Sequence, residues 1–284
     1  MSSATSWIIH NGILIPQEEW KVSTKNRAFR YGDGLFESMR SFGTSVPYLA
    51  IHLQRLKRGA VEMEFETSGD LFNLEVMKSK VAELLERNGH TDSARLRLSV
   101  YRSGGGAYSP DSVEGEFILE SERVHDSRFA LNGRGWKVDV FDYWKKPVIP
   151  WSGIKTTSSL FYVKAGLFQK KNGMDEVLLV NAGNQLCEGS FTNLFVVRSG
   201  ELFTPSLASG CLPGVMRQVI IHEATRMGLK VYEKDLSVND LMVADEVFMT
   251  NAVRGIQWVG AFRSKRYFHR IADKLVHALN QKLS

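Results

Sequence analysis

The stretch Trp151-Ser152-Gly153-Ile154-Lys155-Thr156-Thr157-Ser158-Ser159 places one lysine among hydroxyl and apolar groups. Lys155 is the only charged residue between Lys146 and Lys164, so no acid lies near it in the sequence. Desolvation without a carboxylate partner lowers the pKa of a lysine, and a neutral amine is a nucleophile toward carbonyl groups. An ordinary lysine in a Ser/Thr-rich loop would have the same local sequence, so the rest of the chain has to decide between these interpretations.

The composition sets the broad class of protein. The chain has 284 residues, which is enough for one large domain or two of ordinary size. No apolar run is long enough to span a membrane, and the first residues lack the basic start and apolar core of a signal peptide. The two cysteines, Cys187 and Cys211, do not have the spacing of metal ligands. We therefore expect a cytoplasmic protein with no membrane segment and no metal site.

The charge is slightly basic, with a formal net charge of +5 and a sequence pI near 9.1. The basic residues are scattered singly or in pairs among acids, whereas nucleic-acid-binding proteins usually gather them in one run or stripe. A mixed surface is the favoured interpretation. A non-catalytic or nucleic-acid-binding module remains an alternative that only the basic pI supports.

The first part of the chain predicts a sheet with two helices. Residues 7–10 and 13–15 flank Asn11-Gly12, a strong signal for a two-residue hairpin turn. A second turn at Gly32-Asp33-Gly34 precedes a strand over 35–40. Apolar periodicity predicts further elements, which are helices over 49–63 and 71–87 and strands over 95–101 and 117–119.

Two arginines in this part have ambiguous positions. Arg55 lies off the apolar stripe of its helix, where a solvated side chain is the usual interpretation. Arg97 lies on the non-core face of the strand 95–101, together with Arg95 and Ser99. That face either meets water or lines a cleft for a carboxylate.

The polar stretch 121–135 has few apolar anchors and predicts a connection between domains. We therefore predict a smaller N-terminal domain over 1–120 and a larger C-terminal domain over 136–284. Patterns in the second part predict strands over 136–141, 176–181, 190–197, 201–204, 245–251 and 255–259, and helices over 160–171, 215–227 and 271–283.

Two features of the second part bear on ligand binding. Glu188 stands just before Gly189-Ser190 and a strand of strong β-formers. Pro213-Gly214 leads into a helix, and the first N–H groups of a helix can bind an anion. An acid, an anion site and a nucleophilic lysine together are what an enzyme dependent on pyridoxal 5′-phosphate (PLP) needs.

The order of the local motifs is also familiar. Nearly the whole chain resembles the class IV (fold-type IV) PLP-dependent enzymes, which include branched-chain aminotransferases, D-amino-acid aminotransferases and aminodeoxychorismate lyases. The stretches that carry the resemblance are Arg-Tyr-Gly-Asp-Gly-Leu-Phe-Glu (30–37), His-Leu-Gln-Arg-Leu (52–56), Gly-Ile-Lys (153–155), Glu-Gly-Ser-Phe-Thr-Asn-Leu-Phe (188–195), Leu-Pro-Gly-Val-Met-Arg (212–217) and Asp-Glu-Val-Phe-Met-Thr-Asn (245–251).

The resemblance implies a fold and an assembly. The fold is of the α+β (α/β) class, with two domains that are each a largely antiparallel sheet or barrel flanked by helices. The cofactor lies between the domains, and the enzymes are homodimers with their sites near the subunit interface. The ligands it implies are PLP, an amino acid and a 2-oxo acid, with neither nucleic acid nor membrane as a partner.

The resemblance also implies roles for individual residues. Lys155 is the catalytic residue, which binds PLP covalently and later moves a proton between the substrate and the cofactor. Glu188 pairs with the ring nitrogen, and Arg55 contacts the phosphate. The implied cofactor contacts are Arg55, Lys155, Glu188, Leu212, Val215, Met216, Thr250 and Asn251. The implied substrate contacts are Tyr31, Phe36, Ser38, Arg97 and Ala252.

Departures from the family patterns bear on the reaction. Branched-chain aminotransferases usually have a tyrosine five residues after the lysine and a threonine further on, where this chain has Leu160 and Ala252. The D-amino-acid enzymes have an Arg-x-His carboxylate trap where this chain has Gly104-Gly105-Gly106. The hydroxyl of Ser38 and the Gly-Asp-Gly turn are similar to the lyases, but the lyase Asn-Arg pair after the lysine is missing.

We therefore predict transamination between an amino acid and a 2-oxo acid, in the manner of a branched-chain aminotransferase. The alternative is an aminodeoxychorismate lyase that releases pyruvate and 4-aminobenzoate. The two reactions use the same lysine and the same electron sink.

Overall fold

The computed structural model describes residues 6–283. The chain forms two compact units, which we call unit 1 (Met1–Ser127 with Ile154–Ser159) and unit 2 (Arg128–Gly153 with Leu160–Ser284). The short segment that carries Lys155 thus belongs to unit 1, although it lies within the sequence of unit 2. The predicted connection at 121–135 begins inside a strand that ends at Arg123. The predicted division into an N-terminal and a C-terminal domain stays a prediction.

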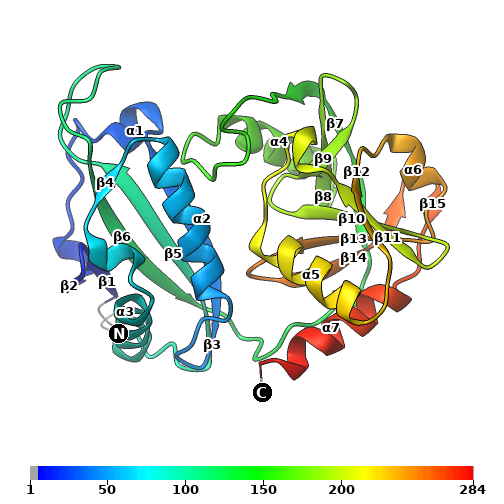
Figure 1. The fold of residues 1–284 in the computed structure, drawn as a ribbon, viewed down its shortest axis with the longest axis horizontal. Coiled ribbons are helices and arrows are strands. Elements are labelled where there is room, and N and C mark those ends of the chain that lie inside the picture. Colours follow the sequence, from blue (N-terminus) through cyan, green and yellow to red (C-terminus); the bar gives the residue numbers. More distant parts are fainter. Residues whose placement is uncertain (1–5, 284) are drawn as a thin grey trace. The chain divides into compact units, whose positions relative to one another are not determined.

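The sheet of unit 1 is mainly antiparallel, in the order β2-β1-β6-β5-β3 (Figure 1). Its strands are β1 (Trp7–His10), β2 (Ile13–Pro16), β3 (Gly34–Phe42), β5 (Ser93–Arg102) and β6 (Glu114–Arg123), and the short β4 (Glu66–Thr67) runs parallel to β6. The predicted hairpin is confirmed by the β1–β2 register. Asn11 and Gly12 have φ angles of 49° and 85°, as a primed turn requires.

Two helices cover one face of this sheet, α2 (Leu49–Glu62) and α3 (Leu74–Arg87) (Figure 1). Their apolar stripes join the inward side chains of β3 and β5, such as Leu35, Met39 and Leu96, in one core. The alternate side chains of the strands therefore project from the opposite face. The short helices α1 (Arg27–Tyr31), η1 (Gln17–Glu19) and η2 (Gly69–Phe72) were not predicted, because each is too short to show a period.

The sheet of unit 2 has the order β12-β11-β10-β13-β14-β7-β8-β9, with β15 (Lys265–Arg266) beside β14. The strands are β7 (Trp136–Lys146), β8 (Glu176–Asn181), β9 (Leu186–Gly189), β10 (Asn193–Arg198), β11 (Glu201–Pro205), β12 (Val231–Lys234), β13 (Glu246–Asn251) and β14 (Gly255–Phe262). The pairs β11–β12, β14–β7 and β7–β8 are parallel, and the others are antiparallel. A bridge between Leu186 and Leu236 joins β9 to the chain after β12, as in a barrel.

The helices of unit 2 are α4 (Leu160–Lys171), α5 (Val215–Arg226), α6 (Val238–Met242) and α7 (Arg270–Gln281), with a 3-10 turn η3 (Leu207–Ser209). Helices α5 and α7 pack against each other and against β13 (Figure 1). The sequence analysis did not predict β12 or α6. Within residues 6–283, every helix is too short or too polar to cross a lipid bilayer.

Candidate active site

The predicted site residues fall into two groups, one in each unit. Unit 1 carries the predicted catalytic lysine, one further predicted cofactor residue and most of the predicted substrate residues. They are Tyr31, Phe36, Ser38, Arg55, Arg97 and Lys155. Unit 2 carries the remainder, which are Glu188, Leu212, Val215, Met216, Thr250, Asn251 and Ala252. We describe each group within its own unit.

The backbone of Lys155 is bound to the edge strand β3. The Phe36 N–H donates to the Lys155 carbonyl oxygen at 3.0 Å, and the Thr157 N–H donates to the Gly34 carbonyl at 2.8 Å. The Thr157 hydroxyl donates to the Gly32 carbonyl at 2.8 Å. A Cβ atom at Gly34 would lie 2.8 Å from the Val100 carbonyl oxygen and 3.0 Å from the Thr157 hydroxyl, so only glycine fits there. The predicted turn at Gly32-Asp33-Gly34 thus packs against the segment that carries Lys155.

The side chain of Lys155 lies over an aromatic ring on the open face of the sheet. Its Nζ is 4.2 Å from the centroid of the Phe36 ring, and the guanidinium carbon of Arg97 is 3.9 Å from the same centroid. Ser38 is the partner of Arg97 in the β3–β5 ladder. Unit 1 thus gathers four predicted residues, an amine, a guanidinium, a hydroxyl and an aromatic ring, on one face.

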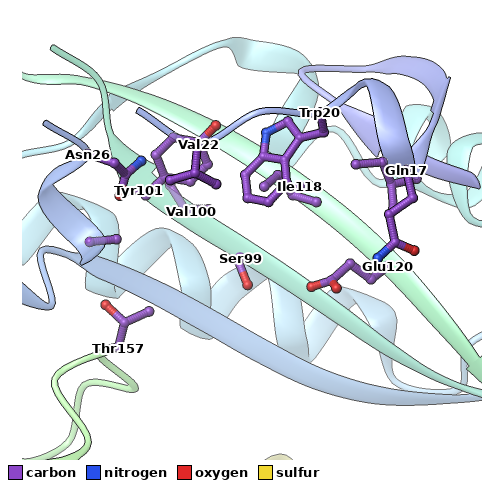
Figure 2. Close-up of a pocket in the computed structure, with 12 residues that line it drawn as sticks. Gln17, Trp20, Val22, Asn26, Ser99, Val100, Tyr101, Ile118, Glu120 and Thr157 are labelled. Atoms are coloured by element: carbon purple, nitrogen blue, oxygen red, sulfur yellow. The ribbon is translucent and has the colours of Figure 1, made fainter. Parts of the chain in front are cut away.

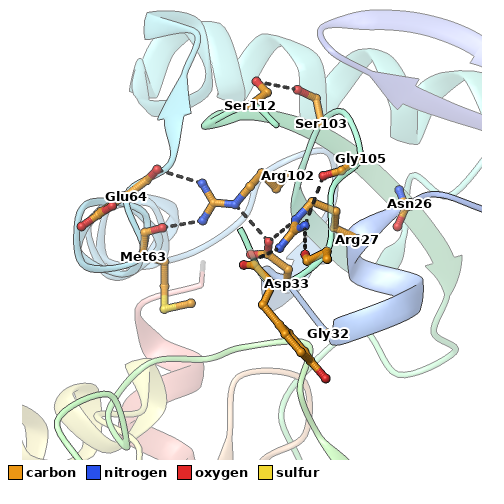
Figure 3. A network of polar contacts seen from close by, with 12 residues as sticks. Asn26, Arg27, Gly32, Asp33, Met63, Glu64, Arg102, Ser103, Gly105 and Ser112 are labelled. Carbon is orange, nitrogen blue, oxygen red and sulfur yellow. Dashed lines mark hydrogen bonds and ion pairs between the residues drawn. The ribbon is translucent and has the colours of Figure 1, made fainter. Parts of the chain in front are cut away.

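A cluster of two arginines and one aspartate holds the turn at Gly32-Asp33-Gly34, which packs against the Lys155 segment (Figure 3). Oδ2 of Asp33 accepts from Nε of Arg27 at 2.8 Å and from Nε of Arg102 at 3.0 Å. Arg27 also donates to the Gly105 carbonyl, and Arg102 donates to the Met63 carbonyl at 2.6 Å. We call Arg27, Asp33 and Arg102 the Asp33 cluster. It ties the glycine-rich loop after β5 to the turn before β3.

Tyr31 ends α1 beside this loop and is partly exposed. Its ring centroid lies 5.6 Å from that of Tyr108 and 5.1 Å from the guanidinium carbon of Arg27. The Tyr108 side chain is 91% exposed. The two tyrosines therefore form an aromatic pair at the surface of unit 1.

Arg55 does not have the solvated side chain that is usual for its position on the helix. Arg55 is buried, and its Nε and Nη2 donate to the two carboxylate oxygens of Glu37 at 2.8 and 2.6 Å. His52 Nδ1 lies 2.7 Å from the same carboxylate. Burial raises the pKa of Glu37, but the charge of Arg55 and the bonds from both partners outweigh it and lower the pKa to about 2. A phosphate contact by Arg55 stays a prediction.

In unit 2, Glu188 is a buried carboxylate with three donors around it. Oε1 accepts from the Tyr162 hydroxyl at 2.8 Å and lies 3.2 Å from Nζ of Lys146, while Oε2 accepts from the Leu212 N–H at 2.8 Å. Burial, followed by the charge of Glu188, raises the pKa of Tyr162, so Tyr162 stays a donor at any working pH. A carboxylate has about four acceptor positions, and donors from residues 6–283 fill three of them here. Glu188 can therefore accept one more hydrogen bond at Oε2.

Helix α5 begins near Glu188, and its first backbone N–H groups are available as hydrogen-bond donors. Gly214 is the N-cap of the helix and no side chain caps it, so the N–H groups of Val215 and Met216 have no partner within the helix. A Cβ atom at Gly214 would clash with Oδ1 of Asn193. Asn193 is opposite Thr250 in the β10–β13 ladder, so both side chains lie on the same face. Within residues 6–283 the buried Thr250 hydroxyl has no hydrogen-bond partner.

The other two predicted residues, Asn251 and Ala252, lie at the end of β13 and in the turn that follows it. Oδ1 of Asn251 accepts from the N–H groups of Val253 and Arg254 at 3.0 and 2.7 Å, and Nδ2 lies 3.5 Å from the Phe191 carbonyl. The Asn251 side chain therefore holds the turn in shape. Ala252 is half-buried in the same turn.

These donors and acceptors fit PLP. A pyridinium nitrogen needs a buried carboxylate with an unfilled acceptor position, which Glu188 has. A phosphate needs N–H and O–H donors at a helix start, which Val215, Met216 and the unpaired hydroxyl of Thr250 provide. The fit rests on two observations in unit 2, the hydroxyl of Thr250 without a partner among residues 6–283 and the start of α5 without a side-chain cap.

Sequence reasoning missed Lys146, Tyr162 and the Asp33 cluster. Lys146 ends β7 and its Nζ donates to the Gly210 carbonyl at 2.6 Å. Nothing in the sequence marks Lys146, because its two partners come from distant segments. Tyr162 follows Lys155 by seven residues, where the family pattern directs attention to position 160 instead.

The comparisons with known proteins identify the family and the fold of the chain. The family model described as Amino-transferase class IV matches residues 34–262. The branched-chain-amino-acid aminotransferase of Escherichia coli (strain K12) is 28% identical over 265 residues, which cover 88% of this chain and 82% of that protein.

Two solved structures have the same fold. The branched-chain aminotransferase of Thermoproteus uzoniensis with norvaline superposes with a TM-score of 0.89 at 24% identity, covering 99% of this chain and 95% of the other. The branched-chain amino acid aminotransferase of Thermobaculum terrenum in its PLP form has a TM-score of 0.85 at 20% identity, covering 98% and 94%. The predicted α+β fold of this enzyme class is confirmed. The chain belongs to the class IV aminotransferases and is a PLP-dependent enzyme.

Proposed function

We propose that this enzyme transfers the amino group of an amino acid with an apolar, branched-chain-type side chain to a 2-oxo acid. The observation that carries the proposal is the position of two cations on one ring. Nζ of Lys155 and the guanidinium of Arg97 lie 4.2 and 3.9 Å from the centroid of Phe36. An amine for the chemistry, a guanidinium for a carboxylate and an apolar wall are what an apolar α-amino acid needs.

In this proposal the residues of unit 1 bind the substrate and move its proton. Nζ of Lys155 would accept the proton from the substrate Cα and would then deliver it to the cofactor rather than back to Cα. Arg97 and the hydroxyl of Ser38 bind the substrate carboxylate, and Phe36 excludes water from the reacting atoms. Tyr31 borders the site, and Arg55 contacts the cofactor phosphate.

The residues of unit 2 hold the cofactor, which supplies an electron sink for the negative charge that develops at the substrate Cα. Glu188 would keep a proton on the ring nitrogen, and the donors Tyr162 and Lys146 hold its carboxylate in place. Leu212 would pack on the ring face. The N–H groups of Val215 and Met216, together with Thr250 and Asn251, bind the phosphate side, and Ala252 borders the substrate.

We further propose that the enzyme is a cytoplasmic homodimer. Exposed apolar side chains on β7 and α4 support a subunit interface, since large exposed apolar patches mark association sites. They are Tyr143, Trp144, Leu160, Val163 and Leu167. Cys187 and Cys211 are buried free thiols, which fits a reducing compartment. Light scattering of the purified enzyme tests the assembly, because a monomer would contradict it.

The reaction is tested by single-turnover spectroscopy of the PLP-loaded enzyme. Leucine, valine and isoleucine should each convert the visible band of bound PLP into that of pyridoxamine phosphate, and a 2-oxo acid should restore it. Alanine should react more slowly at equal concentration. A spectrum that no amino acid changes, with 4-aminobenzoate formed from aminodeoxychorismate, would reject the proposal in favour of the lyase.

A further inference from the structure

Two glutamates of the sheets differ in what surrounds their carboxylates. Glu120 lines a cavity of about 200 Å³ in unit 1, where it is half-buried and lies opposite Arg97 in the β5–β6 ladder (Figure 2). Glu176, the first residue of β8 in unit 2, is fully buried. Within residues 6–283 it forms no ion pair. A buried carboxylate without a cation is unfavourable unless several hydrogen-bond donors stabilise it.

The donors around Glu176 come mainly from one turn, residues 189–192, which joins β9 to β10. Oε1 accepts from the hydroxyl and the N–H of Ser190 at 2.6 and 3.1 Å and from the Val177 N–H at 2.8 Å. Oε2 accepts from the Thr192 hydroxyl at 2.8 Å and from the Phe191 N–H at 3.4 Å. Burial raises the pKa of Glu176, and these bonds offset part of the rise. Every bond except that from Val177 comes from the turn, which therefore closes around the carboxylate.

The turn has room and donors for a carboxylate only. A Cβ atom at Gly189 would lie 2.2 Å from the Thr192 hydroxyl oxygen and 2.8 Å from Oε2 of Glu176, so a side chain there would displace both. The Gly189 N–H closes the turn by donating to the Thr192 carbonyl at 2.7 Å. A carboxylate has about four acceptor positions, whereas the single oxygen of a glutamine has two. A neutral side chain at position 176 could therefore not satisfy the same donors.

The turn lies between two residues of the candidate site. Glu188 precedes it on β9, and Asn193 follows it as the first residue of β10. Both bind the same residue, because the Leu212 N–H donates to Oε2 of Glu188 at 2.8 Å and the Leu212 carbonyl accepts from Nδ2 of Asn193 at 2.9 Å. A shift of the turn would therefore change the direction of the Glu188 carboxylate and its bond to Leu212.

We infer that Glu176 is a positioning residue of this enzyme, which holds the turn 189–192 and thereby directs the Glu188 carboxylate toward the ring nitrogen of PLP. The inference rests on the role proposed for Glu188. Glu176 acts through the turn and not on the cofactor itself. Its loss should therefore weaken the hydrogen bond between Glu188 and the ring nitrogen, and the protonated nitrogen should become more acidic.

Glu176→Gln tests the inference in the PLP-loaded enzyme. The amide has the size of the carboxylate but presents N–H groups to the turn, so at least one donor of the turn loses its acceptor. Nitrogen-15 NMR of PLP labelled at the ring nitrogen shows the pH at which this nitrogen loses its proton. That pH should fall by about one unit, a tenfold change, as expected when one hydrogen bond to a charged group is weakened.

Glu246→Gln is the matched control, because Glu246 is also a buried glutamate at the first position of a strand in unit 2. Its carboxylate accepts from the N–H groups of Ile271 and Ala272 at the start of α7, which carries none of the predicted site residues. This variant should keep the ring-nitrogen transition of the wild type. Equal shifts in the two variants, or no shift in Glu176→Gln, would overturn the inference. If Glu176→Gln does not fold, Ser190→Ala removes the bond of 2.6 Å alone and should shift the transition in the same direction.

Hydrogen exchange separates this inference from the role proposed for Glu188. The Leu212 N–H reports its bond to Glu188 directly, and in the PLP-loaded enzyme it should exchange faster in Glu176→Gln than in the wild type or in Glu246→Gln. If it does so while the wild-type ring nitrogen carries no proton at any pH, Glu176 positions Glu188 and the role proposed for Glu188 is wrong. If the wild-type ring nitrogen is protonated and Glu176→Gln changes neither measurement, the inference is wrong and the role of Glu188 stands. Neither measurement requires turnover, so a failure of the proposed transamination would not affect the result.

Discussion

The Phe36 N–H donates a hydrogen bond of 3.0 Å to the Lys155 carbonyl oxygen, and the Phe36 ring lies under the Lys155 amine. One residue therefore fixes both the backbone and the side chain of the proposed catalytic lysine. The strand that carries Phe36 begins at Gly34, whose carbonyl accepts from Thr157. The position of the lysine thus depends on the turn before β3 as much as on its own segment.

The first prediction concerns the Asp33 cluster. Asp33→Asn removes the negative charge between Arg27 and Arg102, both of which are buried. Removing the anionic partner of two buried arginines should lower the free energy of unfolding by about 3 kcal/mol. The turn should also loosen, so the Thr157 amide should exchange its hydrogen faster. Hydrogen-exchange mass spectrometry of the peptide that contains Lys155 measures this effect.

Asp92→Asn is the matched control for the Asp33 cluster, because Asp92 is an exposed aspartate just before β5. Its exchange at Thr157 should equal that of the wild type. If Asp33→Asn lowers stability but leaves the Thr157 exchange rate unchanged, the cluster does not position the lysine.

The second prediction concerns Tyr162, which donates to Glu188 at 2.8 Å. Tyr162→Phe removes one of three donors from a buried carboxylate and should lower the free energy of unfolding by about 2 kcal/mol. Tyr232→Phe is the control, because the exposed Tyr232 also donates to a glutamate, Glu201, at 3.4 Å. Its effect should stay within about 0.5 kcal/mol. Equal losses in urea denaturation of the two variants would contradict the role assigned to Tyr162.

The third prediction concerns acid stability. The pKa of Glu37 is about 2 in the folded protein against 4.5 for the free group, because Arg55 and His52 outweigh the effect of burial. Its charge therefore contributes stability above pH 4.5, about 3 kcal/mol, that disappears as the pH falls toward 2. Glu37→Gln should be destabilised by about that amount at neutral pH, and its difference from the wild type should shrink below pH 4.5.

Glu62→Gln controls for the general loss of carboxylate charge, because Glu62 is exposed at the end of α2. Denaturation midpoints measured at several pH values test whether the stability difference between Glu37→Gln and the wild type depends on pH. A Glu37→Gln variant whose difference from the wild type stays constant down to pH 3 would show that the ion pair does not have the predicted pKa.

The sequence predicted those elements whose own pattern carries the signal. The hairpin at Asn11-Gly12 and the helix Leu160–Lys171 are confirmed because a turn dipeptide and a bounded apolar segment act locally. Strand β12 could not be predicted, because its residues are mostly exposed and show no alternation. It pairs with β11 through backbone groups, which any sequence provides.

The residues of the candidate site could likewise be predicted only where a local sequence motif marks them. Lys155 and Glu188 stood out because each lies in a motif of the family, whereas the burial of Arg55 depends on Glu37, which lies 18 residues earlier on a strand. Lys146 and Tyr162 meet Glu188 only when β7, α4 and β9 come together. These contacts form only in the tertiary structure, so no spacing of residues in the sequence predicts them.

The most direct test of the account asks which lysine carries PLP. The loaded enzyme is reduced with borohydride, which makes the bond between lysine and cofactor permanent, and its peptides are analysed by mass spectrometry. We predict the phosphopyridoxyl group on Lys155 and none on Lys146, although Lys146 is buried 3.2 Å from the Glu188 carboxylate. The label on Lys146, or on any lysine in a Lys155→Ala variant at wild-type yield, would contradict the account.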